Sequence, residues 1–155
     1  MKTPATRAQD FACFTAASPA RAWAALTAPH ETGGGYLYGM VCRSTWQPGA
    51  PIDCRAVQSP GPVLSSLTGE VLHVVPPCRL SYILQSGPEG PAVYLTWQVR
   101  PCPGGSLVRL QIDEFECSDN DQEIEERWLP VMAALQALLA RDVPASPGGS
   151  CAEGH

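Results

Sequence analysis

The stretch ERWLPVMAALQALLA, residues 126–140, decides the fold, because it reads as a helix whose apolar side chains need a partner surface. At helical spacing the apolar residues gather on one broad face and the polar residues fall away from it. The apolar set is Ile124, Trp128, Val131, Met132, Leu135, Leu138 and Leu139, and the polar set is Glu125, Glu126, Arg127 and Gln136. Two interpretations stay open: the face packs in an ordinary core, or it forms the roof of a cavity.

A proline lies inside this predicted helix, at position 130. Proline removes one backbone hydrogen bond and its ring clashes with the carbonyl four residues back, here that of Glu126. We therefore expect either a kink or a fresh helix start near Pro130. Just before the helix, the sequence CSDNDQEIEE supplies capping side chains and early glutamates, which favour a helix start at that point.

Upstream of the helix, the chain from Met40 to Phe115 reads as a β-meander. Turn sequences (QPGAP, SPGP, VPPC, SGPEGP and PCPGG) separate the apolar or alternating runs, and such short connections make neighbouring strands antiparallel. The predicted strands cover about 41–46, 52–57, 67–75, 79–85, 92–100 and 106–115. Their dry face is large, and the long C-terminal helix is the element available to cover it.

The N-terminal part of the chain predicts one strand and one helix. Phe11 to Thr15 alternates as a strand does. Ser18 is a good helix N-cap, Pro19 occupies the first helical position, and Pro29 ends the helix. The residues HETGGGYLYG, 30–39, then form a pliable loop because three glycines stand in a row.

The composition is that of one globular domain without a basic surface. Of 155 residues, 45% are hydrophobic and 16% are charged, and the net charge is −5. A domain of about 150 residues buries roughly 68–70% of its unfolded surface, which suffices for a core. We expect a domain over 11–141 between a flexible N-terminus, 1–10, and a disordered tail, 142–155, rich in Gly, Pro and Ser.

The charge and hydropathy patterns exclude several partners. The acidic balance argues against a nucleic-acid partner. No apolar run approaches the length of a membrane span, and the first residues lack the apolar core of a signal peptide. We therefore expect a cytoplasmic protein without membrane insertion.

The seven cysteines, no two closer than 12 residues, lack the spacing of a zinc site. We expect reduced thiols that mostly serve as small core hydrophobes, with Cys151 in polar surroundings as the exception. The three histidines are scattered, and His73 is expected to face outward from a strand whose inward residues are Leu72 and Val74. The sequence therefore predicts neither a metal nor a cofactor.

Four stretches follow one another over about residues 11–140, namely SPARAWAALTAP, YLYGMVCRSTWQPGAPI, GEVLHVVPPCRLSY and ERWLPVMAALQALL. Together they resemble the START-like SRPBCC superfamily, in particular its branch described as similar to the activator of heat-shock protein 90 ATPase. The order of predicted elements is also that of the helix-grip (START/Bet v-like) fold. This is an α+β fold in which a curved antiparallel sheet of about seven strands wraps a long C-terminal helix, with one or two short helices after the first strand.

The resemblance implies a deep hydrophobic cavity between the last helix and the sheet, which the superfamily uses for lipids, sterols, polyketides and other apolar molecules. Aromatic and apolar residues at the expected inward positions read as core packing or as the wall of that cavity, and the two readings overlap. The predicted ligand-contact residues are Tyr36, Tyr38, Met40, Trp46, Cys54, Leu72, Tyr82, Leu95, Trp97, Leu110, Ile112, Trp128, Met132 and Leu135. The loop 33–38 is expected to close the cavity, with Trp128 and Met132 near its mouth.

Glu114 has two readings. Strand alternation points it to the same side as Leu110 and Ile112, where an unpaired buried carboxylate would be a candidate general acid or base. Alternatively it lies at the end of its strand and reaches solvent or an arginine. The sequence has no GxSxG nucleophile motif, so Glu114 and Tyr82 are the catalytic candidates, with Tyr36 as a further polar group.

Three functions follow in order of preference. The first is a non-enzymatic binder or carrier of a small apolar molecule. The second is an enzyme of the polyketide cyclase or dehydratase kind that uses Glu114 and a cavity tyrosine. The third is a chaperone-interaction module, which the name of the family branch suggests. A homodimer stays open.

Overall fold

The computed structural model describes residues 5–30, 35–56, 66–87, 92–117 and 121–142. Seven strands and two helices follow one another along the chain, with the helix α1 directly after the first strand and the helix α2 at the end. Their bounds are β1 Ala5–Thr15, α1 Pro19–Thr27, β2 Met40–Arg43, β3 Pro51–Ala56, β4 Ser66–Val75, β5 Arg79–Gln85, β6 Ala92–Cys102, β7 Gly105–Cys117 and α2 Asp121–Asp142.

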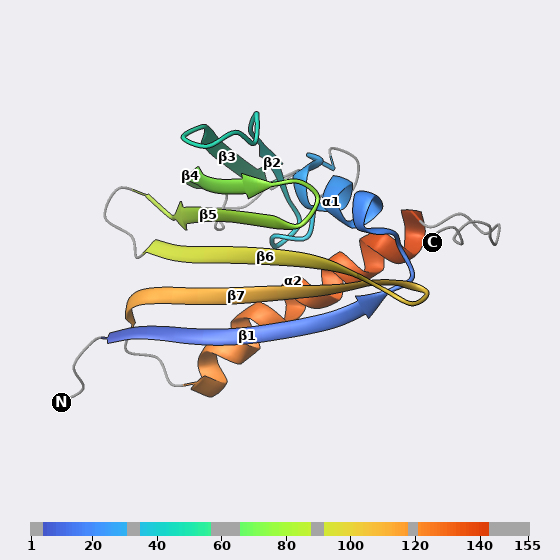
Figure 1. The fold of residues 1–155 in the computed structure, drawn as a ribbon. Helices are drawn as coiled ribbons and strands as arrows, with labels where there is room; N and C mark the ends of the chain where they lie inside the picture. Colours follow the sequence, from blue (N-terminus) through green and yellow to red (C-terminus); the bar gives the residue numbers. More distant parts are fainter. Residues whose placement is uncertain (1–4, 31–34, 57–65, 88–91, 118–120, 143–155) are drawn as a thin grey trace.

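The strands form one antiparallel sheet in the order β1-β7-β6-β5-β4-β3-β2. Consecutive strands from β2 to β7 are neighbours, as short hairpin connections require, and β1 joins the free edge of β7. Figure 1 shows α2 running obliquely across one face of the sheet, behind β6, β7 and β1, with α1 beside its C-terminal half. The predicted α+β class, strand number and element order are confirmed.

The start of α1 follows from its first residues. The Ser18 hydroxyl accepts a hydrogen bond from the Arg21 backbone N–H at 3.2 Å, and Pro19 stands at the first helical position, where no intrahelical donor is lost. Ala22, Ala25 and Leu26 are buried against the core. The predicted N-cap is confirmed.

The helix α2 buries the predicted apolar face. Its buried residues are Ile124, Trp128, Val131, Met132, Leu135, Leu138 and Leu139. The helix is continuous from Asp121 to Asp142 with Pro130 inside it, so a fresh helix start at Pro130 is wrong. Pro130 lies on the exposed side, where water can bond the Glu126 carbonyl that the proline leaves without its helical donor. The alternative, a kink, stays a prediction.

The first strand is longer than predicted. It begins at Ala5 and pairs with β7 from Ala5 opposite Cys117 to Thr15 opposite Ser106. Residues 5–10 are therefore strand and not part of a flexible terminus. The polar residues in this part gave no alternating apolar signal, and backbone pairing with the long β7 determines their conformation. Residues 1–4 and 143–155 of the expected mobile termini lie outside the described residues.

A bulge in β4 turns one predicted inward residue, Leu72, out of the core, while Val74 packs against the core as predicted. Val71 pairs with Tyr82 and is fully buried, whereas His73 pairs with Ser81, so Leu72 is an extra residue without a partner. Leu72 is exposed, and the prediction that it points inward is wrong. A one-residue insertion shifts the alternation, which a regular period of two does not anticipate. The outward position of His73 is confirmed.

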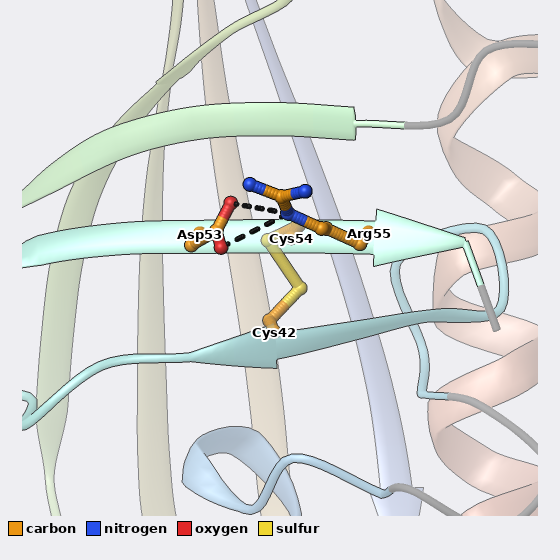
Figure 2. A network of polar contacts seen from close by, with 4 residues as sticks. All are labelled: Cys42, Asp53, Cys54 and Arg55. Carbon is orange, nitrogen blue, oxygen red and sulfur yellow. Dashed lines mark hydrogen bonds and ion pairs between the residues drawn. A yellow bond between two sulfur atoms is a disulfide. The ribbon is translucent and has the colours of Figure 1, made fainter.

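Cys42 and Cys54 form a disulfide between β2 and β3 (Figure 2), so the expectation of reduced thiols is wrong for this pair. The two cysteines are direct partners in the β2–β3 ladder, equidistant from Pro48 in the connecting turn. Free cysteines in the described part are half-buried (Cys13 and Cys102) or exposed (Cys78). Cys54 is buried in the core and Cys13 and Cys42 pack against it, so the prediction of core cysteines holds for these three and fails for Cys78 and Cys102.

Candidate functional site

The predicted ligand-contact residues converge on the interior between the sheet, α1 and α2. Most are buried in one continuous core, namely Tyr36, Met40, Cys54, Tyr82, Leu95, Trp97, Leu110, Ile112, Trp128, Met132 and Leu135. Trp46 is half-buried and packs against the same core. Two predicted members are exposed, Leu72 in the β4 bulge and Tyr38 at the surface of α2.

Three of these residues form a buried polar chain, which we call the Tyr36–Tyr82–Trp97 group. The Tyr36 hydroxyl donates to the Leu26 carbonyl at the end of α1 at 2.8 Å, so the Tyr82 hydroxyl donates to Tyr36 at 3.1 Å. The indole N–H of Trp97 in turn donates to the Tyr82 oxygen at 3.0 Å. Every donor of the Tyr36–Tyr82–Trp97 group has an acceptor. The three residues come from the segment before β2, from β5 and from β6.

Aromatic packing fixes the same group. The Tyr36 and Trp97 rings meet edge to face with centroids 5.3 Å apart, and Trp46 lies tilted over Tyr82 at 5.7 Å. Both arrangements belong to the favourable set for aromatic pairs. The polar chain is therefore held rigidly by its rings as well as by its hydrogen bonds.

Burial keeps both tyrosines protonated. Desolvation raises the pKa of Tyr82 to about 12, although the hydrogen bonds with Tyr36 and Trp97 lower it in part. Desolvation raises the pKa of Tyr36 well above its usual range, and the neighbouring Tyr82 adds to this shift. At neutral pH the two phenols are donors and acceptors of hydrogen bonds, and neither is a base.

A second cluster, the Trp128 cluster, joins β7, α2 and the segment before β2. It consists of Tyr38, Glu114, Arg127 and Trp128. The Glu114 carboxylate accepts from the Arg127 guanidinium at 2.9 Å and from the indole N–H of Trp128. The Glu114 side chain is only 13% exposed, so it lies near the interior but reaches an arginine. Of its two readings, the carboxylate that reaches an arginine is the observed one, although β7 continues beyond Glu114 to Cys117.

Tyr38 covers Trp128 from outside. Its ring lies 5.9 Å from the Trp128 ring, and its hydroxyl donates to the Arg127 carbonyl at 3.1 Å. Burial against these neighbours raises the Tyr38 pKa to about 12, with Arg127 acting in the opposite direction and Glu114 in the same one. Residues 35–38 of the expected closing loop thus contact α2 at Trp128, and 31–34 lie outside the described residues.

A surface pocket of about 400 Å³ opens elsewhere, where the end of β1 meets the last turns of α2. It is lined by Phe14, Thr15, Ala16, Gln136 and Ala140. None of the predicted ligand-contact residues lines it. Phe14 is 51% exposed there, an apolar feature that the sequence gave no reason to single out.

Within the described ranges, no three His, Cys, Asp or Glu side chains come together as they would around a metal ion. No helix in that part of the chain is long and apolar enough to cross a membrane.

The sequence predicted which tyrosines and tryptophans face the interior but not the hydrogen bonds between them. The acceptor role of the Leu26 carbonyl, the contact of Tyr38 with α2 and the Cys42–Cys54 bridge were missed. Only the bridge had a usable signal, because the two cysteines are symmetric about a predicted hairpin turn. The other contacts join residues far apart in sequence, and their pairing depends on the curvature of the sheet.

Comparison with known proteins agrees with this architecture. A family model described as activator of Hsp90 ATPase homolog 1-like protein matches residues 16–140. No curated protein was found to match the chain.

Solved structures with the same fold have low sequence identity. The AHSA1-like protein from Aeromonas hydrophila is 16% identical with a TM-score of 0.68, and the match covers 93% of this chain and 100% of that one. An uncharacterised protein from Rhizobium leguminosarum is 15% identical with a TM-score of 0.70, covering 92% and 99%. Ara h 8.0201 is 12% identical with a TM-score of 0.63, covering 88% and 99%. These likenesses confirm the helix-grip, Bet v1-like fold.

Proposed function

Because the chain belongs to the activator of Hsp90 ATPase homolog 1-like family, with its helix-grip fold, we propose that it binds a small, mostly apolar molecule between α2 and the sheet. The Tyr36–Tyr82–Trp97 group would orient the ligand there. Binding, and not catalysis, would be the function of this interior.

The observation that carries the proposal is a chain of hydroxyl groups inside an otherwise apolar core. Burying a polar group gains little net stability even when it is bonded, so apolar side chains at all three positions of the group would serve packing equally well. Ligand sites, in contrast, combine apolar walls with a few fixed polar groups. Leu95, Leu110 and Ile112 supply such walls, each fully buried beside the group.

The hydroxyl groups favour binding over chemistry. Because burial raises the pKa of both Tyr36 and Tyr82, they keep their protons and can donate to a ligand oxygen but cannot abstract a proton. Glu114 already accepts from Arg127 and Trp128. A polar ligand atom would replace the bond between Tyr36 and Tyr82, the one link in the chain that joins two adaptable hydroxyls.

The entrance would lie at the Trp128 cluster. Tyr38 contacts α2 there through one ring contact and one hydrogen bond. These two contacts are fewer than those that hold the fully buried residues of the core. A ligand would enter when Tyr38 leaves Trp128. The exposed ring of Tyr38 fits this role better than any buried aromatic residue does.

The proposal is tested by locating a bound ligand with methyl NMR. The protein is extracted with organic solvent, the extract is examined by mass spectrometry, and a hydrophobic fluorophore is titrated into the extracted protein. We expect one saturable site, with shifts in the methyl signals of Leu95, Leu110 and Ile112. Replacing Tyr82 by Phe should weaken a ligand that carries a carbonyl by roughly five- to tenfold, the equivalent of one hydrogen bond.

The matched control is Ala140→Arg, which fills the surface pocket near Phe14 with a charged side chain. Binding should be unchanged in this variant if the ligand occupies the interior. Loss of binding in Ala140→Arg with unmoved interior methyl signals would transfer the site to the surface pocket. The absence of any saturable site would overturn the proposal.

A further inference from the structure

The Cys42–Cys54 disulfide lies where the sheet has its shortest strand. β2 has four residues, stands at the end of the sheet and pairs with β3 alone. Strands of this length at an edge have little backbone pairing to hold them. The disulfide therefore attaches β2 covalently to β3, and β2 is the strand with the fewest paired residues in the sheet (Figure 2).

The strand β2 is continuous with the segment that closes the interior. Residues 35–40 form a tight turn, in which the Gly35 N–H donates to the Met40 carbonyl at 3.0 Å and the Gly39 N–H to the Gly35 carbonyl at 3.1 Å. This turn places Tyr36 in the buried polar chain and Tyr38 on Trp128. Because Cys42 follows two residues after the turn, its attachment to β3 also restrains the turn.

The two cysteine residues differ in exposure. Cys54 is fully buried, whereas Cys42 is partly open at the edge of the sheet. The exposed Asp53 and Arg55 side chains pair with each other on the other side of β3 (Figure 2), at 3.1 Å and 3.2 Å, and leave the bridge on the core side. A small thiol can therefore approach Cys42 and not Cys54.

We propose that Cys42 and Cys54 form a redox latch, which when oxidised holds residues 35–43 against the interior and when reduced releases them. The consequence for ligand entry rests on the proposed binding function. The latch itself concerns only the mobility of residues 35–43.

The chemistry is thiol–disulfide exchange with a low-molecular-weight thiol. The thiolate of the small molecule attacks the Cys42 sulfur, the Cys42–Cys54 bond breaks, and Cys54 leaves as a thiolate that takes up a proton. A second small thiol attacks the mixed disulfide, releases Cys42 as a thiol and leaves the small molecule as its own disulfide. Two electrons pass from two small thiols to the protein, and the oxidised small molecule reverses the reaction.

The latch is tested by hydrogen exchange on the full chain, oxidised or treated with dithiothreitol. Opening a 12-residue cross-link should speed amide exchange in residues 35–43 by at least about tenfold. Exchange in β6 and β7 should stay the same, which distinguishes a local release from general destabilisation. Under the same conditions the association rate of a hydrophobic fluorophore should rise in parallel.

Two variants complete the test. The double substitution Cys42→Val and Cys54→Val places β-branched, strand-favouring side chains at both positions and should show the fast exchange whether or not dithiothreitol is present. The control Cys78→Ser, which removes an exposed free thiol, should respond to dithiothreitol as the parent does.

Each outcome has a distinct meaning. Equal exchange of residues 35–43 in the two redox states overturns the latch, as does acceleration that extends equally to β6 and β7. Redox-dependent exchange without fluorophore binding in either state supports the latch and overturns the proposed function. If amide exchange depends on the redox state but the association rate of the fluorophore does not, the latch is supported and the ligand enters elsewhere than at residues 35–43.

Discussion

Tyr82 stands at the centre of the buried polar chain. Its hydroxyl oxygen accepts from Trp97 and its proton goes to Tyr36, while Trp46 covers its ring. The surroundings are otherwise apolar, so no water can replace a lost partner. The contribution of Tyr82 to stability therefore depends mainly on the donor that its removal leaves unpaired, the Trp97 indole N–H. A buried donor without an acceptor costs more free energy than the hydrogen bond contributed.

Replacing Tyr82 by Phe should lower the free energy of unfolding by about 1–3 kcal/mol, because the Trp97 indole N–H then has no acceptor. Chemical denaturation of parent and variant measures the difference. The comparison variant is Tyr94→Phe, at a position 37% exposed on the outer face, where water can replace a lost bond and the change should stay within about 0.5 kcal/mol. Equal effects at the two positions would contradict the role of the buried chain.

At the scale of elements, α2 is held by its apolar face and by two contacts at its N-terminal half. Glu114 of β7 binds two successive side chains of the helix, Arg127 and Trp128, and Tyr38 binds the Arg127 carbonyl. These contacts fix the helix at the expected entrance. Pro130 lies two residues beyond Trp128, on the exposed side.

Replacing Pro130 by Ala should raise the free energy of unfolding by about 2 kcal/mol. The substitution restores the hydrogen bond to the Glu126 carbonyl and removes a ring clash, and the greater freedom of the unfolded chain offsets only part of this gain. Thermal and urea unfolding measure it. The converse change at the exposed Ala133, Ala133→Pro, should destabilise by about 3 kcal/mol. A destabilised Pro130→Ala variant would mean that packing requires the proline bend.

At the scale of the whole molecule, the two edges of the sheet are secured differently. At one edge β1 pairs along its length with β7 and contacts α2. At the other edge β2 is short and depends on the disulfide with β3. Between them the buried tyrosines connect α1, the segment before β2 and the middle of the sheet, so a change in their charge state affects the entire fold.

Alkaline pH should therefore unfold the protein cooperatively. An unfolded tyrosine ionises near pH 10, whereas folded Tyr82 has a pKa of about 12. Because the folded pKa is raised, the stabilisation is complete below about pH 10 and is lost as the pH rises towards about 12. Unfolding free energies measured across this range should fall, with a shallower slope in Tyr82→Phe. Phenolate absorbance of all four tyrosines near pH 10 in a chain that keeps its native circular dichroism would disprove this.

Local patterns in the sequence were sufficient for most of the architecture. The period of the α2 residues identified the buried face, Ser18 and Pro19 marked the start of α1, and turn sequences separated the strands from β2 to β7. These signals depend on residues a few positions apart, and the interactions behind them lie within one helix, strand or turn. For the same reason they failed where a neighbour decided the outcome, as in the polar beginning of β1 and the bulge at Leu72.

The sequence by itself thus determined the elements, their order and most of the residues facing inward. Tertiary structure alone decided that Tyr82 bonds Tyr36 and Trp97, that Glu114 meets Arg127, and that the edge strand is tied through Cys42. Each of these contacts depends on strand register and on the position of α2 over the curved sheet. Register and helix position result from packing the whole core at once, so no single stretch of the sequence contains them.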